Sequence, residues 1–535
     1  MTVGSAPGVT SLPAPTLPAG APNLVLTGLM GTGKTTVGRL AARSLARPFL
    51  DLDAAIASRA GCDLPAIFAS EGEAGFRERE RRVVADAARL SGVVIATGGG
   101  APLDRDGFAA LATTGTVAAL TATADELARR LGDGAGRPLL AGQDPAARVG
   151  ELLAARADAY AAFGAAVDTT GRTPAAVASL LAGRTGPAGP TRLRLVTADG
   201  TTHVIIGDGA IGSTDLRAAL GGVTLAVVVS DAAVAETHAT GVVAALRDAG
   251  IEPVGPVVVP AGEDAKRVEI LASLWDAFRA GGLDPSGAVI AVGGGATLDV
   301  AGFAAATYAR GVALVNVPTT VLAMADAAVG GKVAIDHAGA KNLVGAFHPA
   351  RLVIADTATC ASLPGSARRE GLAEIVKAGL LASPLVLDLV ADAPLAWSVE
   401  QSLRVKIAYV AADPRDRGVR RALNLGHTYA HAIESASDHA IPHGAAVAMG
   451  LVAAARLGAS LGTCPPDLAA RIATVLRRIG LPASPPALDE GRLAAAIGAD
   501  KKRAGGASRF VVPAADGAAL VSGVDPRDAL AMLGA

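Results

Sequence analysis

Short apolar runs alternate with longer helical stretches in residues 23–183. The apolar runs lie at residues 49–52, 93–96 and 117–120. Runs of this length are typical of buried strands, and the stretches between them are long enough for helices. The alternation predicts a parallel sheet with helical crossovers, which is an α/β fold.

A second alternation begins after residue 192. Two apolar segments, 193–196 and 203–206, flank a turn that contains Asp199 and Gly200, and this pattern predicts an antiparallel hairpin. Further strands are expected at residues 225–230, 257–259, 288–292 and 313–317. This arrangement is typical of a nucleotide-binding α/β domain. Beyond residue 360 the pattern becomes mostly helical.

Composition changes at both ends of the first α/β region. The first 22 residues are rich in Pro, Ala and Gly, which predicts a disordered tail. A Gly/Pro-rich stretch breaks the periodicity at 184–191 and predicts a linker. The expected divisions are a tail (1–22), an α/β domain (23–183), the linker (184–191), a second α/β domain (192–360) and a helical domain (361–535).

Charge and cysteine usage limit the partners and the compartment. The 535 residues carry a net charge of -1, so nothing indicates a nucleic-acid or anionic membrane surface. No apolar run has the length of a membrane span, and the N-terminus lacks the features of a signal peptide. Cys62, Cys360 and Cys464 form no CxxC pair. We expect a cytoplasmic protein whose partners are small-molecule substrates.

The first candidate site lies in NLVLTGLMGTGKTTVGRLAA, which begins at Asn23 and contains the first apolar strand, a glycine-rich loop and a helix. Gly28, Gly33, Lys34 and Thr35 have the GxxxxGK[ST] spacing. Backbone amides of such a loop surround phosphate, the lysine reaches the transferring phosphoryl group, and the threonine hydroxyl suits Mg²⁺. The strand before the loop and the helix after it make a chance match a minor alternative.

Further polar groups indicate the phosphate acceptor. They are Asp51 and Asp53 at the end of the second strand, Arg77 on a helix, Gly98, Gly99 and Gly100 after the third strand, Arg137 in GRPLL, and Arg156. Arginines suit a carboxylate and an aspartate suits hydroxyls, so a small hydroxy acid is expected. With these motifs, residues 23–183 resemble shikimate kinase.

This resemblance implies specific roles in the kinase region. Shikimate would be held by Asp53, Arg77, Gly99 and Arg156. ATP would be held by Gly31, Gly33, Lys34, Thr35, Thr36 and Arg137, and Mg²⁺ by Thr35 and Asp51. Lys34, Asp53 and Arg137 would take part in catalysis. Arg130 would lie in or beside a mobile lid, although a solvated helix residue is an equal alternative.

The second candidate site is a histidine cluster. Four of the eight histidines lie within residues 423–444. His427 and His431 are four residues apart and share a helix face, while Pro442 ends that helix before His443. A metal ion would need a third ligand, and Glu374 is the best candidate. For any single histidine, a capping or surface role is the alternative.

Other motifs favour a dinucleotide and an anionic substrate. A glycine run at 293–295 joins a strand to a helix with Asp299 early in it, which is a weak dinucleotide signal alone. Glu263, Lys266, Thr319 and Thr320 strengthen it. Basic residues in apolar surroundings suggest a phosphorylated substrate; they are Arg310, Lys332, Lys341, Lys377, Lys406, Arg420, Lys501 and Lys502, with Asn342 and Asn424 beside two of them.

Taken in order, these motifs resemble 3-dehydroquinate synthase over most of residues 200–505. The resemblance implies Zn²⁺ or Co²⁺ held by Glu374, His427 and His443. It implies NAD⁺ bound by Asp231, Glu263, Lys266, Gly294, Gly295, Asp299, Thr319, Thr320, Lys332 and Lys341. Substrate would contact Arg310, Asp326, Asn342, Asn424 and Lys501. Lys332, Lys377, Lys406, Arg420 and His431 would be catalytic, with packing beside a ligand as the alternative for His431.

We therefore expect a bifunctional enzyme of aromatic amino-acid precursor synthesis, in which a P-loop kinase domain precedes a Rossmann-like NAD-binding domain and a helical metal-binding domain. The resemblance also implies a homodimer through the synthase part. Three alternatives stay open: a different sugar phosphate cyclase, a metal-dependent polyol dehydrogenase, or one inactive domain. Because the two reactions are not consecutive in the pathway, no direct channel is expected.

Overall fold

The computed structural model describes residues 8–132, 145–185, 189–503 and 509–534, without the side chains of residues 145 and 499–503. The chain forms two compact units. Unit 1 contains residues 1–18, 190–382 and 398–535, and unit 2 contains residues 19–189 and 383–397. Among the described residues, no helix is both long enough and apolar enough to cross a membrane.

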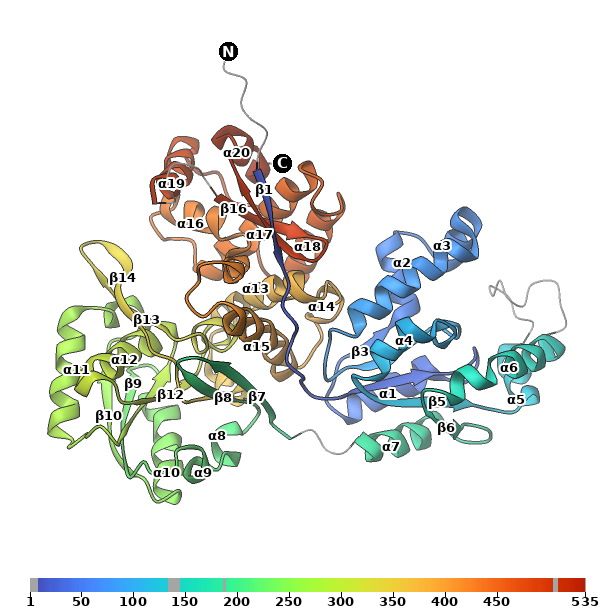
Figure 1. Ribbon diagram of the computed structural model, residues 1–535, viewed down its shortest axis with the longest axis horizontal. Coiled ribbons are helices and arrows are strands. Elements are labelled where there is room, and N and C mark those ends of the chain that lie inside the picture. Colours follow the sequence, from blue (N-terminus) through green and yellow to red (C-terminus); the bar gives the residue numbers. More distant parts are fainter. Residues whose placement is uncertain (1–7, 133–144, 186–188, 504–508, 535) are drawn as a thin grey trace, which may run out of the picture. The chain divides into compact units, whose positions relative to one another are not determined.

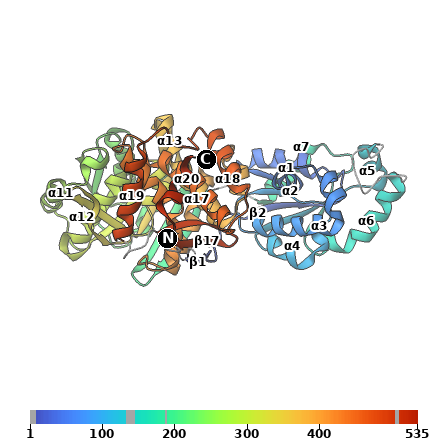
Figure 2. The same cartoon turned by 90° about the horizontal axis from the view of Figure 1, so that it is seen from above.

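Unit 2 is built on a five-stranded parallel sheet with the order β3-β4-β2-β5-β6. Its strands are β2 (Asn23–Thr27), β3 (Phe49–Asp51), β4 (Val94–Ala96), β5 (Gly115–Thr121) and β6 (Ala165–Asp168). Its helices are α1 (Lys34–Ser44), α2 (Leu52–Ala60), α3 (Leu64–Ala87), α4 (Arg105–Ala112), α5 (Ala124–Leu131), α6 (Pro145–Ala161), α7 (Pro174–Thr185) and α14 (Val386–Leu389). Figure 2 shows α1 and α7 on one side of this sheet and α4 on the other.

The core of unit 2 explains why these segments fold together. Leu24 and Leu26 of the central strand are fully buried and pack with Val37 of α1 and Val177 of α7. Asn23 begins the strand, and its side-chain amide donates to the Leu90 carbonyl at 2.9 Å. Because the five strands are parallel, their carboxyl ends meet at one edge of the sheet, where such sheets bind ligands.

Unit 1 contains a seven-stranded sheet with the order β10-β9-β11-β12-β15-β8-β7. Its strands are β7 (Thr191–Thr197), β8 (Gly200–Gly207), β9 (Leu225–Asp231), β10 (Glu252–Val259), β11 (Ala288–Gly293), β12 (Ala313–Pro318) and β15 (Leu352–Asp356). The β7–β8 pair is antiparallel, as the hairpin pattern predicts, and the other pairs are parallel. The predicted α/β fold class is thus confirmed (Figure 1).

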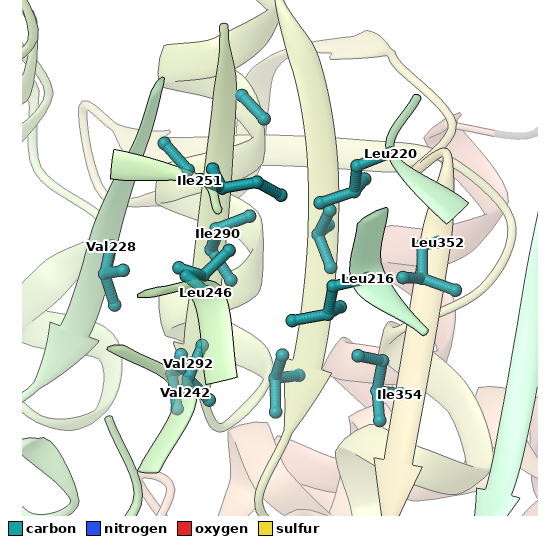
Figure 3. Close-up of a cluster of buried hydrophobic side chains, with 14 of the residues drawn as sticks. Leu216, Leu220, Val228, Val242, Leu246, Ile251, Ile290, Val292, Leu352 and Ile354 are labelled. Atoms are coloured by element: carbon teal, nitrogen blue, oxygen red, sulfur yellow. The ribbon is translucent and has the colours of Figure 1, made fainter. Parts of the chain in front are cut away.

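Helices cover this sheet and bury its apolar residues. They are α8 (Ala210–Ser213), α9 (Leu216–Ala219), α10 (Thr240–Asp248), α11 (Val268–Ala280) and α12 (Gly295–Thr307). Figure 3 shows Leu216, Leu220 and Leu246 packed over strand residues Val228, Ile290 and Ile354. This packing fixes the positions of β9, β11 and β12, whose carboxyl ends carry the predicted dinucleotide residues.

The rest of unit 1 is mostly helical, as predicted. It contains α13 (Gly365–Ala382), α15 (Leu395–Ala412), α16 (His427–Ala436), α17 (His443–Ser460), α18 (Leu468–Arg478), α19 (Glu490–Arg503) and α20 (Pro526–Gly534), with the first residues of α15 grouped in unit 2. Short turns of other helical types are η1 (Ala101–Leu103) in unit 2, and η3 (Ala235–Ala239), η4 (Gly262–Ala265), η5 (Tyr308–Arg310), η6 (Ala323–Ala327), η7 (Thr357–Ser362) and η8 (Val419–Asn424) in unit 1. Strands β13 (Lys332–His337) and β14 (Ala340–Phe347) form an antiparallel hairpin.

The predicted disordered tail is wrong for the residues described. Gly8–Pro13 forms strand β1, which pairs antiparallel with β17 (Gly517–Ser522), and β17 pairs in turn with β16 (Arg509–Ala514). A Pro/Ala/Gly-rich segment has little tendency to form structure alone, but it can add a strand to an existing hairpin. Residues 1–7 lie outside the described residues.

Two predicted boundaries also differ from the observed elements. The predicted linker overlaps the end of α7 at Thr185 and the start of β7 at Thr191, and residues 186–188 lie outside the described residues. Residues 383–397, expected in the helical domain, group with unit 2. There the Trp397 indole donates to the Ser91 carbonyl at 2.7 Å, and the Ser383 hydroxyl donates to the Asp86 carbonyl at 2.9 Å.

Candidate active sites

The glycine-rich loop of unit 2 has the backbone of a phosphate-binding loop. Gly28, Gly31 and Gly33 all have positive φ angles, and a Cβ on Gly28 would lie 2.1 Å from the Leu120 carbonyl oxygen. Only glycine fits there. The Lys34 ammonium donates to the carbonyls of Gly28 and Leu29 at 2.8 and 3.2 Å, so the lysine lies across the loop.

Thr35 and Asp51 meet at the mouth of the loop. The Thr35 hydroxyl donates to Asp51 at 2.7 Å, and the other Asp51 oxygen accepts from the Asp53 amide at 3.1 Å. Oxygen donors at this spacing suit Mg²⁺. Burial, and then the neighbouring Asp51, raise the pKa of Asp53. Gly31 and Gly33 lie in the same loop and Thr36 lies in the first turn of α1, and their contact with ATP stays a prediction.

A cavity of about 840 Å³ opens beside this loop. Its lining includes Lys34, Asp53, Arg77, Gly99 and Arg156, so the predicted acceptor residues converge on one space. The Arg156 guanidinium donates to the Gly99 carbonyl at 2.9 Å, and the Tyr160 hydroxyl donates to the same oxygen at 2.7 Å. Arg77 lines the cavity and forms an ion pair with Glu73, an exposed side chain that also lines it.

Glu80 is a cavity residue that the sequence reasoning missed. Its side chain is 8 % exposed, and one carboxyl oxygen has no hydrogen-bond partner within residues 8–132, 145–185 and the later described ranges. Burial, followed by the charge of Asp53, raises the pKa of Glu80 to about 7. Its spacing from Arg77, one helical turn along α3, is the signal that could have found it.

The predicted lid residues have different outcomes. Arg130 donates to the Gly31 carbonyl at 3.2 Å and to the Thr169 carbonyl at 2.8 Å, so its guanidinium links the phosphate loop to the segment after β6. The Arg130 side chain is 23% exposed, and a contact with ATP stays a prediction. Arg137 lies outside the described residues, and its role stays a prediction.

In unit 1, three side chains meet as the sequence predicts for a metal site. Ligand atoms of Glu374, His427 and His443 all lie within 4.8 Å of one another. One oxygen of Glu374, which is 2 % exposed, has no hydrogen-bond partner among the described residues and lies 3.6 Å from the His427 Nε2 and 4.0 Å from the His443 Nε2. A buried, unpartnered carboxylate oxygen facing two imidazoles fits a divalent metal ion of the catalytic type.

The surroundings of these residues favour ligation. Burial, then the charge of Lys377, lower the pKa of His427 well below its usual range, so its imidazole is neutral. The His427 Nδ1 contacts the Leu425 carbonyl at 3.2 Å, and the His443 Nδ1 contacts Glu434 at 3.1 Å. Such contacts orient metal-binding imidazoles. Glu434 was missed, although it lies seven residues after His427 on α16 and so shares its face.

The dinucleotide residues gather at the carboxyl ends of β9, β11 and β12. Asp231 accepts from the Thr297 hydroxyl at 3.3 Å and from the Gly294 amide at 3.5 Å, which fixes the turn into α12 at Gly295. The Thr319 hydroxyl is buried without a hydrogen-bond partner in the part of the chain that the structure describes, and the Thr320 hydroxyl accepts from the Ala323 amide at 3.1 Å. An open glycine turn with an unpartnered buried hydroxyl fits a bound nucleotide.

Lys266 forms the centre of an acidic cluster beside this turn. Its ammonium donates to Asp299 at 2.9 Å and lies 3.6 Å from Glu263 and 3.8 Å from Asp336. Burial raises the pKa of Asp299 to about 6 despite the nearby lysine. Asp336 was not predicted; its carboxylate accepts from the Asn342 amide at 2.8 Å.

Three of the predicted basic side chains are buried in unit 1. Lys377 forms an ion pair with Glu374, and the Lys406 ammonium donates to Asp326 at 2.6 Å. Both lysines are buried. Buried Arg420 donates to the Pro414 carbonyl at 2.8 Å and the Gly330 carbonyl at 3.2 Å. Buried cations attract the anionic groups of a phosphorylated substrate.

The remaining predicted residues lie at various distances from this centre. The side chain of Asn342 accepts from Lys266, which places it in the acidic cluster, and Lys341 lies 3.5 Å from Glu263. Lys332 pairs with Asp416, another residue the sequence reasoning missed. The His431 ring lies 5.7 Å from the His427 ring. Arg310 and Asn424 are exposed, and the side chain of Lys501 lies outside the described residues.

Family models match two separate parts of the chain. The model for shikimate kinase matches residues 30–183. The models for the N-terminal and C-terminal parts of 3-dehydroquinate synthase match residues 256–370 and 371–503.

Individual proteins resemble the second part. A 3-dehydroquinate synthase from Halorhodospira halophila is 42% identical over 306 residues, which are 55% of this chain and 86% of that protein. One from Thermobifida fusca is 44% identical over 287 residues, covering 52% and 78%. The solved structure of ValA, a 2-epi-5-epi-valiolone synthase from Streptomyces hygroscopicus subsp. jinggangensis 5008 with NAD⁺ and Zn²⁺ bound, has a TM-score of 0.56 and 26% identity, covering 62% of this chain and 95% of that one.

Proposed function

The chain belongs to the 3-dehydroquinate synthase family and carries a shikimate kinase region ahead of it, and from this premise we propose that one polypeptide catalyses both reactions. The first is ATP-dependent 3-phosphorylation of shikimate. The second converts 3-deoxy-D-arabino-heptulosonate 7-phosphate to 3-dehydroquinate and phosphate. The observation that carries the second is the unpartnered Glu374 oxygen facing two imidazoles among buried cations.

In the kinase site, the side chains have separable tasks. Asp53 faces the cavity, where its carboxylate would accept the hydrogen bond of the hydroxyl to be phosphorylated and orient it. Arg156 and Arg77 would bind the substrate carboxylate, and Lys34 would leave the loop carbonyls to hold the transferring phosphoryl group. Thr35 and Asp51 would hold Mg²⁺, which neutralises the charge of the ATP phosphates.

In the synthase site, Glu374, His427 and His443 would hold the metal, and Asp231, Lys266, Asp299 and the glycine turn would hold NAD⁺. When bound, these groups supply reversible hydride transfer at a substrate hydroxyl and polarisation of its oxygen.

The chain's own residues bind and position the substrate. Lys377, Lys406 and Arg420 would hold the anionic groups and the departing phosphate, because all three are cationic and buried near the triad. Lys332 would join them when it leaves Asp416. His431 stands beside a proposed metal ligand with an imidazole suited to moving protons near neutral pH.

The first experiment uses the purified full chain with the seven-carbon keto sugar acid phosphate, catalytic NAD⁺ and Zn²⁺, with and without chelator. We expect chelator-sensitive phosphate release, 3-dehydroquinate by product NMR and no net NADH. Stoichiometric NADH without phosphate would indicate a polyol dehydrogenase instead. No reaction, with intact kinase activity, would favour a different sugar phosphate substrate for the synthase part.

We also propose a homodimer formed through the synthase part. Leu343, Val344 and Phe347 of β14 are large apolar residues with exposed fractions of 60%, 41% and 40%. Light scattering of the purified chain would test this, because a monomer mass would refute it.

A further inference from the structure

The N-terminal strand belongs to the synthase unit, although the kinase region follows it in the sequence. Strand β1 runs antiparallel to β17 with Gly8 opposite Ser522 and Pro13 opposite Gly517. The family models match residues 30–183 and 256–503, so β1, β16 and β17 all lie outside them. The family models therefore give no information about this three-stranded sheet.

Several specific contacts hold the N-terminal segment in place. Leu12 is 7 % exposed, whereas its neighbours in β1 are exposed. Gly517 has a φ of 96°, and a Cβ there would lie 2.8 Å from the Ala14 amide nitrogen. The buried Arg404 of α15 donates to the Pro18 carbonyl at 2.9 Å. Residues 8–18, which we call the strap, are thus anchored at both ends.

The sheet completed by the strap supports the catalytic elements. β1, β17 and β16 all pack against η8, which carries Arg420. The Arg509 carbonyl of β16 accepts from the Thr428 hydroxyl at 2.9 Å, and the Phe510 ring lies 5.1 Å from the Tyr429 ring. Thr428 and Tyr429 directly follow His427 in the first turn of α16.

We infer that the strap is a positioning element of the synthase site. By pairing with β17 it holds η8 and the first turn of α16, and so holds Arg420 and His427 in their working positions. The strap, not the kinase region that follows it, is the part of the N-terminal chain that the synthase needs. The inference rests on the proposed synthase reaction only where turnover is measured, because amide exchange and Co²⁺ binding need no reaction.

The test compares substitutions in the full chain. Leu12→Asp removes the buried anchor, Thr10→Asp places the same charge at an exposed position of the same strand, and Leu12→Ile keeps an apolar anchor. We expect Leu12→Asp to increase amide exchange of residues 419–431 about tenfold and to weaken Co²⁺ binding followed by absorption. Thr10→Asp and Leu12→Ile should leave both unchanged, and kinase activity should be unaffected in all three.

The inference would be overturned if Leu12→Asp matched Thr10→Asp in exchange and Co²⁺ affinity. These two readouts need no turnover, so they separate a wrong strap from a wrong reaction. Where the reaction is measured, the turnover rate of Leu12→Asp should fall while Leu12→Ile restores it.

A cross-link tests the pairing itself in a Cys62→Ser background. Thr10 and Leu520 are opposite each other, whereas Ser522 is the partner of Gly8. The Thr10→Cys/Leu520→Cys pair should therefore form an intramolecular disulfide on mild oxidation more readily than Thr10→Cys/Ser522→Cys. Equal or absent cross-linking in the first pair would also overturn the strap.

Discussion

At the residue scale, three carboxylates show which parts of the two sites the sequence predicts and which it misses. The resemblance to 3-dehydroquinate synthase predicted Glu374, His427 and His443, which the structure brings together. Glu434 and Glu80 lie inside the same motifs but were missed, because acidic residues are common on exposed helix faces. Glu78 and Glu80 illustrate the difficulty, since the Glu78 side chain is 47% exposed and Glu80 is buried. Only packing distinguishes them.

Replacing Glu434 with Gln should weaken metal binding without removing a ligand. The carboxylate accepts from His443 and raises the pKa of that histidine against the opposing effect of burial. Without its charge, His443 loses the partner that orients it, and we expect Zn²⁺ affinity to fall roughly 10- to 100-fold. Competition with a chromophoric chelator measures this. Asp438→Asn, an exposed change just after α16, is the control, and equal affinities of the two variants would contradict the prediction.

Glu80 should make the stability of unit 2 depend on pH. Its pKa of about 7 in the folded state lies above the ordinary value of 4.5. The folded state therefore keeps a proton that the unfolded state releases, and the carboxyl costs stability as the pH rises from 4.5 to 7. The cost at pH 8 is about 3 kcal/mol, from about 1.4 kcal/mol for each pH unit.

Glu80→Gln removes this cost. We expect the variant to gain about 2–3 kcal/mol at pH 8 and under about 1 kcal/mol at pH 5. Urea unfolding is followed by Trp397 fluorescence in a Trp275→Phe background, since these are the two tryptophans of the chain and Trp397 belongs to unit 2. Glu78→Gln should change little at either pH. A gain of the same size at both pH values would show that ionisation of Glu80 is not the cause.

At the element scale, the strands of both sheets were predictable because buried parallel strands appear as apolar runs. Residues 93–96 and 288–292, for example, correspond to β4 and β11. Strand β1 was not predictable, since its partner β17 provides the pairing and Gly8 bonds with Ser522 from 514 positions away. The Pro, Ala and Gly content of the first 22 residues indicated disorder, and it contains no information about pairing with β17 at the other end of the chain.

The phosphate loop gives a prediction for backbone geometry. Gly28→Ala places a Cβ on the Leu120 carbonyl at a φ of 134°, so it should destabilise unit 2 by more than about 2 kcal/mol and abolish ATP binding. Gly61→Ala is the control, because its φ is 68° but nothing lies within 4 Å of its Cβ. It should cost roughly 1 kcal/mol. Similar losses in Trp397-monitored urea unfolding would mean that positive φ alone, rather than the close approach, requires Gly28.

At the scale of the whole molecule, the chain starts in unit 1, forms most of unit 2 and returns to unit 1. The motifs predicted which residues serve each reaction, since each site draws its side chains from one unit. They did not predict that unit 1 includes the N-terminal strand, or that residues 383–397 belong to unit 2. Connectivity of this kind depends on tertiary pairing, which motif order does not encode.

Because each set of reactive side chains lies within a single unit, the two activities should fail separately. Lys34→Ala removes the ammonium from the phosphate loop and should abolish shikimate phosphorylation while leaving phosphate release from the keto sugar acid phosphate within about twofold of wild type. Glu374→Gln weakens the metal site and should do the reverse. Both rates are measured on the same preparations, with Co²⁺ binding as a check that Lys34→Ala keeps the triad intact. If Lys34→Ala slowed both reactions equally, the two sites would be coupled, and the separate placement of their residues would not be enough to explain how the enzyme works.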